Sequence, residues 1–66
     1  MAKVVRVETA RATFAEVTGA LEDAALVAAD AQATPDLAAA RDACDRLIAR
    51  LDACRGRLLR SRQWIA

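Results

Sequence analysis

The feature that most constrains this chain is a run of helix-breaking and helix-capping residues near its midpoint, residues 32–37. It contains the only proline and separates two long alanine-rich segments. Thr34 can cap a following helix with its hydroxyl, and Pro35 suits the first helical position, where no amide donor is required. The carboxylate of Asp36 would interact favourably with the positive end of the helix dipole. The sequence therefore predicts an all-α fold, a two-helix antiparallel hairpin.

The 66 residues are expected to form a single domain with four segments. The first, rich in β-branched valine, is read as an arm or as a short strand. A strand before two helices resembles the ribbon-helix-helix repressors in that position only, because the first helix expected here is much longer than theirs. The segments are an arm or strand over 1–7, a first helix over about 8–33, a turn and cap over 34–36, and a second helix over about 35–64.

Apolar residues recur along both helical segments at alternating intervals of three and four, which is the spacing of a helix-packing seam. Leu26 falls outside this seam, on a second stripe of small residues that includes Gly19 and is read as a second contact surface. The opposite side carries an acid every seven residues and is expected to face solvent. The predicted dimer or core seam comprises Phe14, Val17, Leu21, Cys44, Leu47, Leu51, Cys54 and Leu58, with Leu26 as the additional contact residue.

Two alanine-rich helices of this length bury too little apolar surface to form a stable core by themselves. Ordering 66 residues costs roughly 100 kcal/mol, which requires burial of on the order of 4,000 Å² of apolar surface. One hairpin does not provide that area. Self-association or a permanent partner is therefore expected.

The charges favour a particular mode of self-association, because they divide the expected hairpin into a basic open end and an acidic loop half. Two hairpins stacked head to tail would place each basic end on the other's acidic half. We therefore predict a homodimer that forms an antiparallel four-helix bundle. The open end holds Lys3, Arg6, Arg11, Arg55, Arg57, Arg60 and Arg62 against Glu8, and the loop half holds Glu16, Glu22, Asp23, Asp30, Asp36, Asp42 and Asp45 against Arg41 and Arg46.

The residue types that most enzymes need are scarce. The chain has no histidine, and no base stands beside Ser61 or either cysteine to activate a nucleophile. Cys44 and Cys54 would lie about 15 Å apart on one straight helix, too far for a disulfide within it. They are read as small core hydrophobes, with a bridge between chains or a shared metal site as the alternatives. We expect a protein that is not an enzyme and has no catalytic, metal or cofactor site.

No apolar run approaches the roughly 20 residues of a membrane span, and the N-terminus lacks the apolar core of a signal peptide. A soluble cytoplasmic protein without membrane partners is expected. High alanine and arginine with a single lysine would suit a GC-rich bacterium, its phage or a plasmid.

The best candidate for a partner-binding surface is the basic cluster near the C-terminus. Arginine and tryptophan dominate the energetics of many protein interfaces. The same residues could instead solubilise the helix end and cover the core, or neutralise phosphates of a nucleic acid. One aromatic is too few for a base-stacking platform. The predicted cluster is Arg55, Arg57, Arg60, Arg62 and Trp64.

In length, mid-chain turn and heptad seams, the chain is similar to Rop, a family of small plasmid RNA-binding regulators that are dimers of helical hairpins. The outline is also similar to the needle-subunit co-chaperones of type III secretion. The first resemblance implies a four-helix bundle that binds RNA, although the polar stripe expected for RNA contact is absent and Phe14 lies on the seam.

The sequence therefore predicts a small regulatory module that presents helix faces to another, unidentified protein, as an inhibitor, anti-activator, adaptor or co-chaperone. Binding of RNA or DNA through the arginine-rich end is the first alternative. A structural subunit of a larger bacterial or phage assembly is the second.

Overall fold

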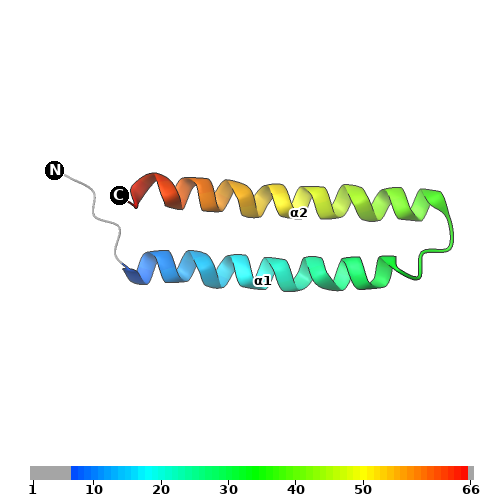
Figure 1. Cartoon of the computed structure of the whole chain (residues 1–66), viewed down its shortest axis with the longest axis horizontal. Helices are drawn as coiled ribbons and strands as arrows, with labels where there is room; N and C mark the ends of the chain where they lie inside the picture. The colour runs from blue at the N-terminus through cyan, green and yellow to red at the C-terminus, as the bar shows by residue number, and fades with distance from the viewer. Residues whose placement is uncertain (1–6, 66) are drawn as a thin grey trace.

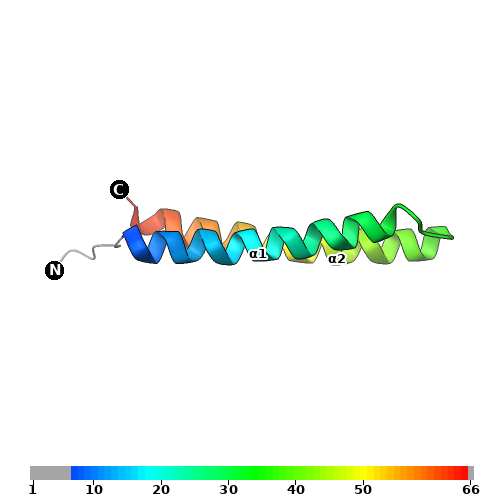
Figure 2. The ribbon, with the colours of Figure 1, turned by 90° about the horizontal axis from the view of Figure 1, so that it is seen from below.

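The computed structural model describes residues 7–65, which form two long α-helices joined by a short turn. Helix α1 spans Val7–Ala31 and helix α2 spans Leu37–Trp64. The helices lie side by side and antiparallel, with the turn at one end of the rod and both chain ends at the other (Figure 1). Figure 2 shows them crossing gently along their length. The predicted all-α hairpin is confirmed, whereas the predicted arm or strand lies outside the described residues except for Val7, which begins α1.

The first helix ends by tightening its last turn before the chain reverses. The backbone amides of residues 32–34 donate to carbonyls three residues earlier, at 3.1–3.2 Å. Such short-range bonds satisfy carbonyls that would otherwise lack a partner at the end of a helix. The turn is therefore built largely from backbone hydrogen bonds.

The second helix begins one residue after Asp36, which is its N-cap. The Oδ1 atom of Asp36 accepts a hydrogen bond from the Ala39 backbone amide at 2.8 Å, and the Asp36 backbone is extended. The prediction that Thr34 caps this helix with Pro35 at its first position is therefore wrong. The Asp36 carboxylate, and not the Thr34 hydroxyl, accepts the hydrogen bond from the first turn of α2, so Pro35 lies before the helix.

A seam of small residues joins the two helices. Among the described residues, Val17, Ala24, Ala43 and Cys54 are the buried apolar ones, and no described side chain is less than 2% exposed. Half-buried residues extend the seam along the rod, at alternating intervals of three and four on α1 and at wider intervals toward the end of α2. The interhelical seam comprises Ala10, Thr13, Val17, Ala20, Ala24, Val27 and Ala31 of α1 with Ala40, Ala43, Leu47, Cys54 and Ser61 of α2.

The residues of the predicted seam lie in two different places. Val17 and Cys54 are buried between the helices and Leu47 is half-buried, so these three contribute to the hairpin itself. The other predicted residues lie on the outer surface of the hairpin, where the opposite helix leaves them exposed. These exposed residues are Phe14, Leu21, Leu26, Cys44, Leu51 and Leu58.

Candidate protein-interaction surfaces

One side of the hairpin carries a stripe of large apolar side chains from each helix. Phe14 and Leu21 of α1 are 52% and 46% exposed, and Leu51 and Leu58 of α2 are 50% and 39% exposed. In each helix the two residues are seven apart, which is two turns, so they project from the same side. We refer to the surface made by Phe14, Leu21, Leu51, Leu58 and Leu59 as the apolar face.

A shallow groove of about 330 Å³ runs along the apolar face, where the two helices meet. Buried Val17 and Cys54 form its base, and leucines from both helices form its walls. Two arginines border it. The groove is lined by Val17, Leu21, Leu51, Cys54, Arg55, Leu58, Leu59 and Arg62.

A second hollow lies at the open end and, apart from Trp64, is lined by residues with polar or charged groups. It has a volume of about 340 Å³ and combines arginine, hydroxyl and indole groups from the two helices. The Thr13 hydroxyl donates to the Thr9 carbonyl oxygen at 3.3 Å, so one side of the hollow is fixed to the α1 backbone. We refer to it as the polar notch, which is lined by Thr9, Thr13, Glu16, Arg57, Arg60, Ser61 and Trp64.

Two ion pairs connect the helices, and one of them lies in the polar notch. Glu16 Oε2 is 4.0 Å from Arg57 Nη1, and Asp23 Oδ2 is 4.0 Å from Arg50 Nη1. All four side chains are substantially exposed, so each pair contributes at most about 1 kcal/mol to stability. The pair with Arg57 places Glu16 beside the arginines of the open end. Glu16 therefore does not lie with the acids of the loop half, where the sequence pattern grouped it.

Gly56 provides space for one of the notch arginines. A Cβ atom at Gly56 would lie 3.3 Å from Nη1 of Arg60, which shows that the Arg60 side chain folds back over the glycine. A Cβ atom at Gly19, by contrast, would extend into open space, with no neighbouring group within 4 Å. Glycine inside a helix costs about 1 kcal/mol of stability relative to alanine. At Gly56 the absence of a side chain leaves room for the guanidinium group of Arg60.

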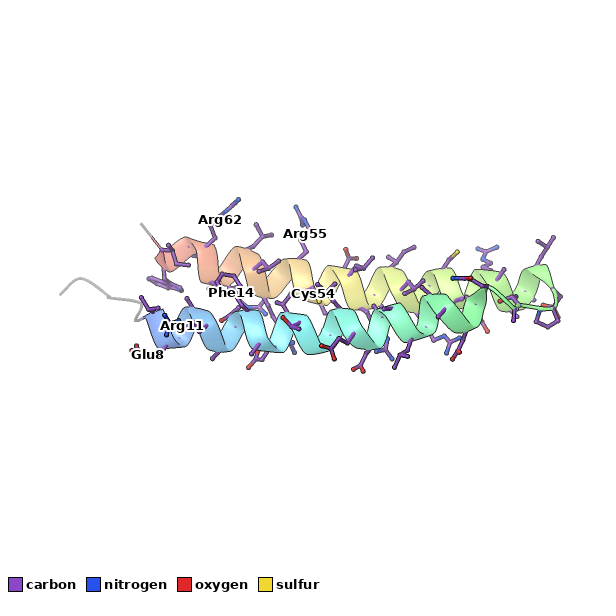
Figure 3. The ribbon with its side chains drawn as sticks, turned by 60° about the horizontal axis from the view of Figure 1, so that its bottom comes forward. Glu8, Arg11, Phe14, Cys54, Arg55 and Arg62 are labelled. Atoms are coloured by element: carbon purple, nitrogen blue, oxygen red, sulfur yellow. The ribbon has the colours of Figure 1, made fainter. Side chains whose placement is uncertain are left out.

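The five residues of the predicted partner-binding cluster are divided between the two surfaces. Arg57, Arg60 and Trp64 line the polar notch. Arg55 and Arg62 border the apolar groove, and Figure 3 shows both projecting from α2 on the side away from α1, while Cys54 points toward α1. The structure therefore does not bring the five residues together into one patch.

Several surface residues were missed by sequence reasoning or lie apart from both surfaces. Thr9, Thr13 and Ser61 were not predicted as site residues, and they join the notch only because the two helices pack antiparallel. Leu26 is 65% exposed and lines neither hollow.

Within residues 7–65 no three His, Cys, Asp or Glu side chains are grouped so that they could hold a metal ion. Neither α1 nor α2 combines the length and the apolar character needed to cross a bilayer. No protein-family model matches the chain, and no match was found among curated proteins or solved structures.

Proposed function

We propose that this chain is a non-enzymatic protein-binding module that works as an antiparallel homodimer, in which the apolar faces of two hairpins pack together as a four-helix bundle. The observation that carries the proposal is the apolar face itself. It places large side chains from both helices on one side of a hairpin whose own seam is filled mainly by alanine. Bundle helices need such a widened apolar surface, with residues beside the seam as well as in it.

The surface area supports association. A compact protein of 7.1 kDa exposes about 4,100 Å², whereas this chain exposes 5472 Å². A rod exposes more surface than a compact domain of equal mass, and a standard interface would bury roughly 800 Å² of it per partner. A hairpin with four small buried residues among those described also lacks the core that an independent domain needs. A second copy of the chain would cover the exposed apolar surface and would add its own side chains to a shared core.

Charge complementarity favours the antiparallel arrangement. Arg11, Arg55 and Arg62 lie in the open half, whereas Glu22 and Asp45 lie in the loop half. A two-fold axis perpendicular to the long axis of the hairpins would place each open half over the partner's loop half. A parallel dimer would place like charges together. Dimer formation of this kind weakens with salt because exposed charges are screened.

The dimer leaves the opposite side of each hairpin accessible, and we propose that the module binds its partner protein there, as a regulator. Nucleic acid fits this side less well. An acidic residue recurs every two turns of α1 on this side, at Glu16, Asp23 and Asp30, so a phosphate backbone running along the rod would meet three carboxylates. Two of these carboxylates already pair with the nearby Arg57 and Arg50.

The proposed dimer is tested by the concentration dependence of unfolding. Because dissociation and loss of helix are coupled, the Tm measured by circular dichroism should rise by several degrees over about a hundredfold increase in chain concentration. A Tm that does not change with concentration, together with a sharp cooperative transition, would contradict the proposal.

A further inference from the structure

We propose that the polar notch is a docking site for an acidic peptide segment of the partner protein, with glutamate or aspartate side chains bound between Arg57 and Arg60 and the adjoining peptide lying against Trp64. This inference deepens the proposed function by naming the chemistry of the partner. It uses the side of the hairpin that the dimer leaves free.

The charges of the notch are complementary to a carboxylate ligand. Arg57 already faces one carboxylate, that of Glu16, at 4.0 Å, a distance beyond a direct hydrogen bond. A carboxylate from a partner can therefore compete for the same guanidinium. Arg60 lies in the same notch and adds a second cation, with its side chain folded over Gly56. Two guanidinium groups in one hollow can bind carboxylates through paired, charge-assisted hydrogen bonds.

The other walls favour a peptide over a simple anion. The Ser61 side chain offers a hydroxyl donor, and Trp64, which is 45% exposed, offers a large rigid aromatic surface. Tryptophan and arginine in one hollow are the residue types that anchor protein interfaces. The volume of about 340 Å³ admits one or two side chains and not a folded domain.

The size and the surroundings of the notch limit the ligand to a short segment. Further along the same side, Asp23 and Asp30 follow Glu16 at intervals of two helical turns. An extended polyanion would meet Asp30 and the ion pair of Asp23 with Arg50 there, whereas a segment with its acids confined to the open end would meet the notch arginines. A peptide with a local acidic cluster therefore fits this surface.

The test is a titration of the dimeric full-length chain with hexaglutamate at low salt, followed by the fluorescence of Trp64, the only tryptophan of the chain. Saturable binding with a Kd below about 1 mM is expected. The variant Arg57→Gln/Arg60→Gln should bind at least about tenfold more weakly, because two charge-assisted contacts are lost.

The matched control is Arg41→Gln/Arg46→Gln, which removes the same charge from α2 but in the loop half, outside the notch and the apolar groove. It should bind hexaglutamate within about threefold of the unmodified chain. Equal weakening in both double variants would overturn the proposal, because it would show attraction to overall charge alone. Absence of saturable binding would also overturn it.

A parallel titration with a short oligouridylate distinguishes the nucleic-acid alternative. If the oligonucleotide binds more tightly than hexaglutamate and the Arg57/Arg60 variant weakens it, the notch is a phosphate site and the peptide proposal is wrong. The oligomeric state of each sample, measured by sedimentation, separates the two proposals. A dimer that fails to bind hexaglutamate contradicts the docking site only, and a monomer that binds it contradicts the dimer only.

Discussion

Replacing Leu21 by aspartate is expected to dissociate the dimer and to remove most of the helical signal at micromolar concentration. Leu21 lies at the centre of the apolar face and forms part of the groove wall. Each dimer contains two copies of the substitution. Each copy loses about 2 kcal/mol of apolar burial and also places a charge in an apolar interface. A loss of at least about 4 kcal/mol per dimer corresponds to a dissociation constant raised roughly a thousandfold.

Leu26→Asp is the matched control, because it makes the same change on the same helix. Leu26 is 65% exposed and lines neither hollow. Both variants share the unfavourable helix propensity of aspartate, and Leu26→Asp also places a like charge four residues from Glu22 and Asp30, which makes it the more stringent control. The measurements are circular dichroism at 222 nm and sedimentation velocity at equal concentration. If Leu26→Asp dissociates the chain as strongly as Leu21→Asp, the contact surface lies on the stripe of small residues and the apolar face is not the dimer interface.

The second large effect is expected at the interhelical seam, where Ala24→Leu should destabilise the folded state by about 1–3 kcal/mol per chain. Ala24 is 6% exposed. A leucine there has to push α1 away from α2 or adopt a strained rotamer, because the seam is made of small residues. Urea unfolding at a fixed chain concentration measures the change.

Ala15→Leu provides the comparison for this substitution, since Ala15 is exposed and lines neither the seam nor either hollow. Leucine and alanine have similar helix propensity, so this variant should stay within about 0.5 kcal/mol of the unmodified chain. Equal stability of Ala24→Leu and Ala15→Leu would mean that the two helices do not pack through the small-residue seam.

The hairpin was predictable from the sequence because its signals are local. A proline and a capping acid between two alanine-rich segments determine two helices and one reversal. The choice between Thr34 and Asp36 as the N-cap was harder to predict from the sequence, because both side chains are good caps and lie two residues apart. The extended backbone of Asp36 and its hydrogen bond from the Ala39 amide identify Asp36 as the cap.

The location of the large apolar residues was harder to predict because two stripes share the same spacing. Val17 belongs to a stripe that runs through Phe14 and Leu21, and equally to one that runs through Thr13 and Ala20. Side-chain size favours the first stripe as a core. In the structure the second stripe joins the helices, since small residues allow close approach, and the large residues remain outside.

The division of the arginine cluster follows from helix geometry and could have been predicted. At 100° per residue, Arg55 and Arg62 lie two turns apart on one side of α2, whereas Arg57 and Arg60 lie on another. The rest of the polar notch could not have been predicted in this way. Thr13 and Glu16 lie beside α2 only because of the register in which the two helices pack. The notch depends on tertiary packing.

Sedimentation equilibrium of the unmodified chain at micromolar concentration and physiological salt tests the central claim most directly. The proposed antiparallel bundle predicts a single species of twice the 7.1 kDa chain mass, with loss of helix wherever dilution or high salt produces monomer. A fully helical species of one chain mass under the same conditions would contradict it, because the hairpin would then be stable with its apolar face exposed to water.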